Sequence, residues 1–213
     1  SQHKIVVDTV RRINERREGD KITLVDMIGQ SGMCVEPFAG SRGVSFSLLC
    51  SNHRKNKQCR PWLTNAPGFE KRILSDPLHV DELVEMSKTH MEGGEKRQTC
   101  PWKAARRVAK EAQIIVCDYS HLFIEEVRNA SLKAMELNLD DLIIIVDEAH
   151  NLPDRVRMGM QRRLTPTMVR NAASEIEEHL GEMQKVAQVN DLLGEAIMLK
   201  SWCLAVCKEF RLV

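Results

Sequence analysis

The 213-residue sequence lacks several features that would place it in a functional class at once. No apolar stretch is long enough to span a bilayer, and no secretory signal opens the chain. The net charge of +1 gives no overall field that would attract nucleic acid, so a basic binding face has to be local. We therefore expect no membrane partner, and a chain with one sizeable core or a core plus a smaller insert.

Paired Cys-x-x-Cys motifs are also absent, although the sequence contains seven cysteines. This odd number, in a chain too large to need disulfide bonds for stability, favours a reducing compartment in which some cysteines bind metal and others are buried. Burial in the core is the simpler interpretation of Cys117, which lies inside an apolar segment. The same holds for Cys203 and Cys207, which are one helical turn apart on an apolar face.

Four further cysteines bracket an irregular region, residues 34–100, which has scattered glycine and proline and little obvious core of its own. Four thiolates around a metal centre would stabilise such a region. Their long and uneven spacing suits a [4Fe–4S] cluster better than a zinc ribbon, although a zinc site remains an alternative. The cluster ligands predicted in this way are Cys34, Cys50, Cys59 and Cys100. The alternative zinc ligands are Cys50, His53, Cys59 and Cys100.

Regular patterns in the rest of the chain predict strands that alternate with helices. The predicted strands and short apolar segments cover residues 22–28, 113–117 and 142–146. The first predicted helix begins near the start of the chain, and the others cover residues 80–90, 102–112, 120–137, 166–180 and 183–210. Strands and helices of this length, in alternation, indicate an α/β fold with a parallel sheet.

The most informative stretch is the aliphatic run 142–146, which two adjacent carboxylates follow at once. We interpret the run as a buried parallel strand, so Asp147 and Glu148 are expected at the carboxyl end of the sheet, where α/β sheets bind their ligands. One carboxylate could hold hydrated Mg²⁺ beside a nucleotide, and the other could orient or deprotonate a water molecule. An Asp-Glu pair alone is weak evidence, whereas Asp147-Glu148-Ala149-His150 is a more specific motif.

The sequence contains no Gly-x-x-x-x-Gly-Lys-Ser/Thr loop that would bind the phosphates of such a nucleotide. It also starts abruptly with Ser1-Gln2, directly before the first predicted helix. We therefore expect an internal piece of a longer protein, which lacks ATPase activity by itself.

Taken together, the order of these motifs resembles the XPD family of iron–sulfur DNA helicases in superfamily 2, and its archaeal members most closely. Ser1-Gln2 resembles the end of motif Ia, and residues 147–152 resemble motif II in sequence and position. Cys34 and Cys100-Pro101-Trp102 resemble the settings of the first and last cluster ligands, and residues 114–122 resemble the strand and Tyr-x-x-Leu turn that follow. The chain departs from the family at Gln30, where an arginine is common.

The resemblance implies a partial RecA-like motor domain 1, made of residues 1–33 and 101–153, with an inserted iron–sulfur domain, residues 34–100, and the start of a helical Arch domain, residues 154–213. It implies ATP, Mg²⁺ and a [4Fe–4S] cluster as cofactors. Asp147 would organise Mg²⁺-ATP, Glu148 would be the base for the hydrolytic water, and His150 would connect the nucleotide site to the second motor domain or to DNA.

The resemblance further implies a monomer that moves 5′→3′ along single-stranded DNA and unwinds forked duplexes during nucleotide excision repair, beside other repair proteins. Its location would be the cytoplasm in an archaeon and the nucleus in a eukaryote. Two basic groups are the predicted DNA contacts, although a run of charge is usually only a solvated surface. One group lies near Trp62, and consists of Arg54, Lys55, Lys57 and Arg60. The other follows Cys100, and consists of Lys103, Arg106 and Arg107. An alternative function is a metal-bound nucleic-acid-binding module without ATPase activity.

Overall fold

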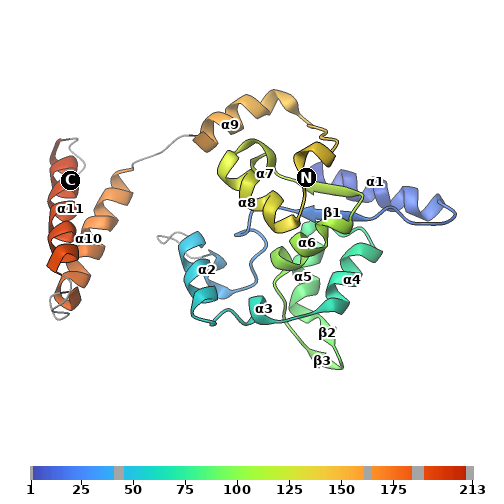
Figure 1. Cartoon of the computed structure of the whole chain (residues 1–213), viewed down its shortest axis with the longest axis horizontal. Coiled ribbons are helices and arrows are strands. Elements are labelled where there is room, and N and C mark those ends of the chain that lie inside the picture. The colour runs from blue at the N-terminus through green and yellow to red at the C-terminus, as the bar shows by residue number, and fades with distance from the viewer. Residues whose placement is uncertain (1, 41–45, 161–164, 184–189, 210–213) are drawn as a thin grey trace. The chain divides into compact units, whose positions relative to one another are not determined.

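The computed structural model describes residues 2–40, 46–160, 165–183 and 190–209 (Figure 1). It divides into two compact units, Ser1–Met160 and Gln161–Val213, and each has a hydrophobic core of its own. The four expected domains stay a prediction, because this boundary separates compact bodies and does not identify functional domains.

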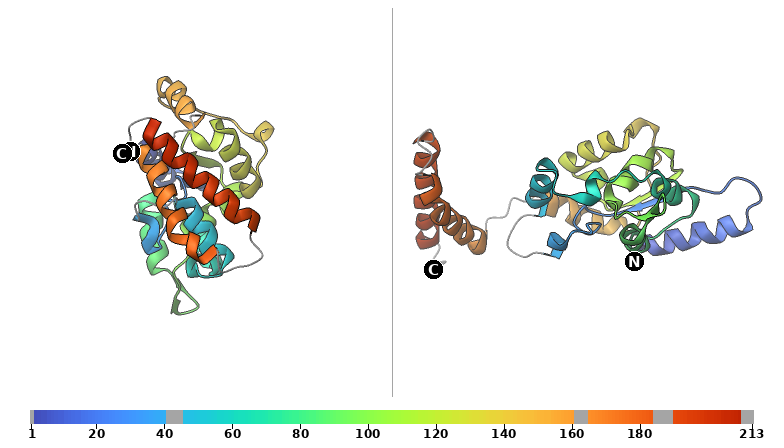
Figure 2. Two further views of the ribbon diagram at one scale, coloured as in Figure 1. Left: turned by 90° about the vertical axis from the view of Figure 1, so that its left-hand side faces the viewer. Right: turned by 90° about the horizontal axis from the view of Figure 1, so that it is seen from below.

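The first unit is a mixed α/β body with a small parallel sheet and mostly helices, which confirms the expected class in this coarse form. Strand β1 (Leu24–Met27) pairs in parallel with β4 (Ile114–Cys117), with Leu24 opposite Ile114. All four residues of β1 are buried. Helix α1 (Gln2–Arg16) covers this sheet, because Val7 and Val10 pack against Leu24. The end of α1 and the turn after it project from the unit (Figure 2).

The region between Cys34 and Cys100 is mostly helical. Its elements are the 3-10 helix Pro37–Gly40, the helices α2 (Phe46–Lys55), α3 (Arg60–Leu63), α4 (Pro67–Ser75) and α5 (Val80–Thr89), and the antiparallel strands β2 (Met91–Glu92) and β3 (Glu95–Lys96). A proline in the first turn starts α3 and α4, where a missing N–H costs nothing. A capping box starts α5, in which the His79 ring accepts the Asp81 N–H and the Glu82 carboxylate accepts the His79 N–H.

The sequence pattern indicates little obvious core in this region, whereas the structure buries several of its apolar side chains in the core of the first unit. Phe69, Ile73 and Leu83, from α4 and α5, are buried in one core with Met27 of β1 and with two alanines of α6 (Pro101–Val108), Ala104 and Ala105. The apolar positions on these helices are spaced three and four residues apart, but the helices are too short to give a sustained pattern. The region therefore packs as part of the first unit.

Two predicted helices are interrupted. The basic helix ends with α6 and continues as the 3-10 helix Ala109–Glu111. The next predicted helix is two helices, α7 (Ser120–Phe123) and α8 (Glu125–Met135), because Ile124 between them has an extended backbone. Helix α8 ends at Glu136, whose φ of 55° is the left-handed conformation common at helix ends.

The prediction of a buried strand at residues 142–146 was wrong. These residues form no helix or strand, and the side chains of Ile143 and Ile145 are 95% and 89% exposed. A strand requires a neighbour with which to share backbone hydrogen bonds, and β1 and β4 pair only with each other among the described residues. The 3-10 helix Ala149–Asn151 and helix α9 (Leu152–Met160) complete the first unit.

The second unit is a pair of helices, α10 (Pro166–Met183) and α11 (Asn190–Glu209), which lie side by side (Figure 2). Val169 of α10 and Cys203 of α11 are buried between them, and Lys200 forms a 3.0 Å ion pair with Glu177. The burial of Cys203 agrees with its interpretation as a core residue, whereas the side chain of Cys207 lies outside the described residues. In the part of the chain that the structure describes, no helix combines the length and the apolar character needed to cross a membrane.

Candidate functional site

The Asp-Glu-Ala-His motif forms a tight turn after the run 142–146. Glu148 has a φ of 50°, a left-handed conformation that is uncommon for any residue except glycine. Two hydrogen bonds within the turn stabilise this backbone. The Glu148 N–H donates to Oδ1 of Asp147 at 2.9 Å, and the Asn151 N–H donates to the Glu148 carbonyl at 2.9 Å. The turn therefore has a defined shape although the run before it is unpaired.

Two side chains from distant parts of the sequence hold this turn. The hydroxyl of Tyr119 donates to the carbonyl oxygen of Asp147 at 2.5 Å and lies 3.2 Å from that of Glu148. The amide of Gln2, at the start of α1, donates to Oε1 of Glu148 at 3.3 Å. Since Tyr119 comes two residues after β4, the turn lies beside the carboxyl end of the parallel strands, where α/β sheets bind their ligands.

The carboxylate of Glu148 is accessible to solvent. Its side chain is 43% exposed, and the Nδ1 atom of His150 lies 3.2 Å from Oε2. The ring of His150 is itself 73% exposed. Glu148 is thus a carboxylate with an imidazole on one side, an amide on the other and an open face towards solvent.

The structure brings the four predicted cluster cysteines together from α2, from the start of α3, from the start of α6 and from the loop before residue 37. Burial raises the pKa of all four thiols, to about 11 for Cys100. Each pair of the four sulfurs also interacts electrostatically, so the thiols oppose one another's ionisation. Four thiols gathered in this way suit a positively charged centre, which favours their thiolate form.

Donors surround these sulfurs. Cys59 and Cys100 occupy the N-cap positions of α3 and α6. The backbone N–H groups of Trp62 and Lys103 act on these two sulfurs and oppose the effect of burial on the pKa. Gln30, which stands where the XPD family commonly has arginine, donates from Nε2 to the sulfur of Cys50 at 3.2 Å. The contact at this position is therefore made by a neutral donor.

The alternative zinc site can be compared with the contacts of its four expected ligands. Among the described residues, no three histidine, cysteine, aspartate or glutamate side chains are arranged to hold one metal ion. The sulfurs of a tetrahedral zinc site lie within about 4 Å of one another, since each Zn–S bond is about 2.3 Å long. His53, the fourth ligand of the alternative zinc site, stacks its ring 4.6 Å from that of Phe38. These contacts do not assemble the alternative zinc site.

Several of the predicted DNA contacts have partners inside the protein. The ammonium group of Lys103 donates to the carbonyl oxygens of Trp62 at 2.6 Å and Thr64 at 3.3 Å. Arg106 stacks on Trp102 and donates to the Ala130 carbonyl at 2.7 Å.

Two further arginines are engaged in a similar way. Arg107 lies 3.3 Å from the carboxylate of Glu70. Arg54 stacks on the ring of Trp62 at 4.7 Å and donates to the carbonyl of Cys50. All four cations thus have partners within the first unit.

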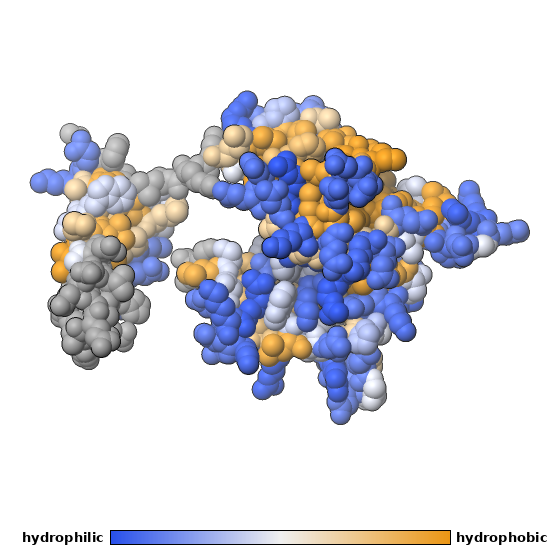
Figure 3. All heavy atoms as spheres, in the orientation of Figure 1, coloured by the Kyte–Doolittle hydropathy of each residue, from blue (hydrophilic) through white to orange (hydrophobic). Residues whose placement is uncertain are grey.

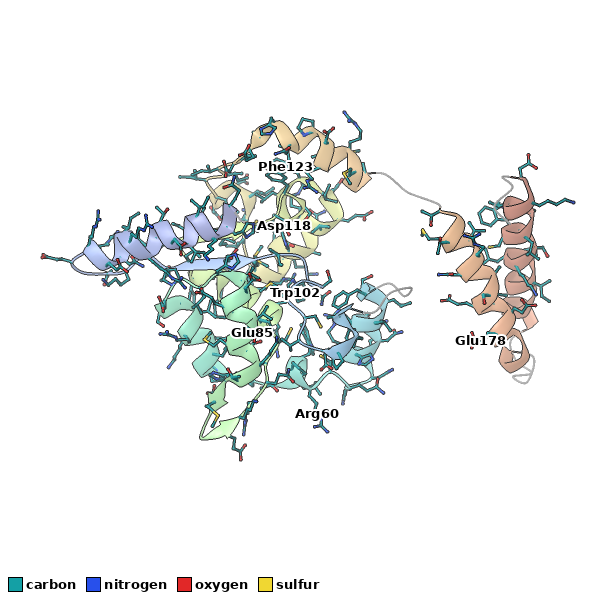
Figure 4. All side chains as sticks on the ribbon, turned by 180° about the vertical axis from the view of Figure 1, so that it is seen from behind. Arg60, Glu85, Trp102, Asp118, Phe123 and Glu178 are labelled. Atoms are coloured by element: carbon teal, nitrogen blue, oxygen red, sulfur yellow. The ribbon has the colours of Figure 1, made fainter. Side chains whose placement is uncertain are left out.

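The other three predicted contacts are different. Lys55, Lys57 and Arg60 are exposed, and none has a side-chain partner within the described ranges. Arg60 lies at the rim of the first unit (Figure 4). Within the two predicted DNA-contact groups, these three residues are therefore the ones whose charges are available to an outside ligand.

Sequence reasoning missed two residues of the site. Gln2 and Tyr119 were recognised only as parts of motifs, and their contacts with the Asp147-Glu148 turn were not foreseen. The available signal was the position of Tyr119 just after a predicted strand, at the sheet edge where Asp147 was expected. Gln2 gave no such signal, because it is 146 residues away from Glu148 in sequence.

An Asp-Glu-Ala-His turn beside the carboxyl end of two parallel strands is the arrangement expected of a nucleotide-dependent motor of superfamily 2. The chain belongs to the DEAD_2 family, whose model matches residues 1–169. The match includes all four clustered cysteines and the turn. The expected relationship to XPD-type helicases of superfamily 2 is thereby confirmed at the level of the family.

Curated relatives agree with this family. ATP-dependent DNA helicase chl1 of Schizosaccharomyces pombe is 25% identical over 210 residues, which are 94% of this chain and 23% of the relative. The Fanconi anemia group J protein homolog of Gallus gallus is 33% identical over 94% of this chain and 16% of the relative. Regulator of telomere elongation helicase 1 of Mus musculus is 24% identical over 92% and 16%. The chain spans less than a quarter of the length of these relatives.

Proposed function

We propose that this chain is part of an ATP-dependent DNA helicase that translocates 5′→3′ along single-stranded DNA and opens forked duplexes in nucleotide excision repair. The main support is the Asp147-Glu148 turn beside the carboxyl end of the sheet, within the residues that the family model matches. The longer protein acts as a monomer and meets other repair proteins. The reported relatives are eukaryotic, which favours the nucleus over the archaeal cytoplasm as its location.

Three side chains carry the proposed chemistry. Asp147 would hold hydrated Mg²⁺, Glu148 would act as base for the attacking water, and His150, 3.2 Å from Glu148, would connect the nucleotide site to the second motor domain or to DNA. The exposed face of Glu148 leaves room for the water and for the phosphate. Since these residues contain no phosphate-binding loop, the chain by itself lacks ATPase activity.

We further propose that Cys34, Cys50, Cys59 and Cys100 hold a [4Fe–4S] cluster. Its support is that the four thiols are close enough for each pair to interact electrostatically. When bound, the cluster would join the starts of α3 and α6 to helix α2, which carries Cys50, and to the loop that carries Cys34. Lys55, Lys57 and Arg60 lie near this joint in sequence and are the proposed phosphate contacts.

Anaerobic purification followed by a visible spectrum and iron and zinc assays tests the cluster. A brown protein with about four irons per chain is expected. One zinc and no iron would identify a zinc module instead.

Substitution of Glu148 by Gln tests the motor in the longer protein. Glu148→Gln should reduce ATP turnover by about a hundredfold or more, because it removes the base while keeping the shape of the side chain. Binding of single-stranded DNA should persist. Unchanged turnover in this variant, with DNA binding retained, would favour the alternative of a nucleic-acid-binding module.

A further inference from the structure

Tyr119 is the single tyrosine of the sequence, and its hydroxyl lies at the Asp147-Glu148 turn. It comes from the segment after β4, near Asp118, whose carboxylate accepts the Gly29 N–H after β1 at 3.2 Å. Figure 4 shows where Asp118 lies in the first unit. The Tyr119 backbone is thus anchored where the two parallel strands end.

The turn needs this anchor because the residues directly before it are not hydrogen-bonded to the sheet. Residues 142–146 make no strand pairing, and the side chains of Ile143 and Ile145 are almost fully exposed. Glu148 also keeps a left-handed backbone, which a residue other than glycine adopts only when its surroundings impose it. Among the described residues, the hydrogen bonds that join this turn to distant parts of the chain come from Tyr119 and Gln2.

The two contacts act on different parts of the turn. Gln2 bonds to the carboxylate of Glu148, which is the group that the proposed chemistry uses. Tyr119 bonds to the carbonyl oxygens of Asp147 and Glu148 and leaves both carboxylates free. These two carbonyls belong to the peptide planes on either side of the Glu148 Cα atom. A donor that contacts both therefore restrains the φ and ψ of Glu148, and the position of the 147–148 peptide in turn affects the direction in which Asp147 leaves the backbone.

We propose that Tyr119 is a positioning residue, whose hydroxyl aims the Asp147 and Glu148 carboxylates by holding the backbone of their turn. The inference rests on the proposed ATPase function. It makes Tyr119 dispensable for binding the nucleotide and necessary for fast hydrolysis, because a small misplacement of a catalytic group lowers the rate without weakening contacts elsewhere.

Hydrogen exchange on the 213-residue chain tests the anchor itself. Tyr119→Phe removes the hydroxyl and keeps the ring, so the Glu148 and Asn151 amides, which are bonded within the turn, should exchange at least several-fold faster. Ser120→Ala is the matched control, because it removes a hydroxyl from the next residue and should leave these amides unchanged. Equal exchange in wild type and Tyr119→Phe would overturn the inference.

Steady-state ATP turnover in the longer protein tests the consequence. Tyr119→Phe should lower kcat by about 10- to 100-fold and leave KM for ATP unchanged. Glu148→Gln separates the two proposals. If Glu148→Gln is inactive while Tyr119→Phe has the wild-type kcat, or a raised KM only, the positioning role is wrong and the proposed function stands. If Glu148→Gln keeps full turnover, both are overturned.

Discussion

The carboxylate of Asp26 connects three elements of the first unit, although its side chain is fully buried. Its Oδ1 atom lies 2.6 Å from Nδ1 of His3 on α1. Its Oδ2 atom accepts the Val80 N–H, at the start of α5, at 2.8 Å, and Nε2 of His79 lies 3.9 Å away. A buried carboxylate is stable only with such partners, and Asp26 thereby fixes α1 and α5 to β1.

The partnership between His3 and Asp26 predicts a pH-dependent stability. The hydrogen bond to Asp26 raises the pKa of His3 above 6.5, with further help from the charges of Asp26 and Asp118 and against the effect of burial. The folded state therefore binds the proton more tightly than the unfolded state. The resulting stability is fully present below about pH 6.5 and is lost as the pH rises through the folded-state pKa.

His3→Gln should remove this contribution. We expect the variant to lose about 1–3 kcal/mol of unfolding free energy at about pH 6 and less at about pH 8. Urea denaturation of both proteins across this range measures the difference. A constant gap between wild type and variant would mean that His3 does not change its protonation on folding.

At the scale of elements, the start of α6 contacts the short helix α3 beside Cys59 and Cys100. The Cys100 N–H donates to the Pro61 carbonyl at 3.1 Å, and the rings of Trp62 and Trp102 are 6.4 Å apart. Lys103 joins the two helices, because its ammonium group caps the carbonyls at the end of α3. The Lys103 side chain, which was expected to contact DNA, thus links α3 and α6 inside the protein.

The same substitution at two lysines separates these roles. Lys103→Gln should lower the unfolding free energy by about 1.5–3 kcal/mol through the loss of charged hydrogen bonds, and should leave the salt dependence of DNA binding unchanged. Lys55→Gln should leave stability unchanged and reduce the slope of log K against log salt by about 0.7 for single-stranded DNA. Denaturation and salt titrations of both variants check this. The opposite pattern would make Lys103 a phosphate contact.

The sequence allowed prediction of those elements that local pattern determines. The apolar segments that became β1 and β4, the helix α5 with its acidic first turn, and the parallel pairing all follow from periodicity and order. The strand 142–146 was wrongly predicted, because a sequence shows that Ile143 and Ile145 suit a buried strand but not whether a neighbouring strand is present. The hydrogen bonds of Lys103 could not be predicted either, since its partner Trp62 is 41 residues away in sequence.

At the scale of the whole molecule, the first unit has an uncovered apolar area. Figure 3 shows hydrophobic side chains on the part of this unit where α7 and α9 lie. The run 142–146 adds exposed isoleucines and unpaired backbone groups, which together form a template for pairing with another chain.

The isolated chain should therefore self-associate at high concentration. The double substitution of Ile143 and Ile145 by Thr should reduce light scattering by several-fold, while the unfolding free energy changes by no more than about 0.5 kcal/mol. Ile5→Thr is the control, because Ile5 is 62% exposed on a helix whose backbone is already hydrogen-bonded. Equal scattering from wild type and the double variant would locate the association elsewhere.

The core shared by α4, α5 and α6 bears on what would remain if the proposed cluster were removed. None of the four clustered cysteines belongs to this core. These helices are therefore expected to stay packed in a metal-free chain, and removal of the cluster would first loosen the surroundings of Cys34, Cys50, Cys59 and Cys100.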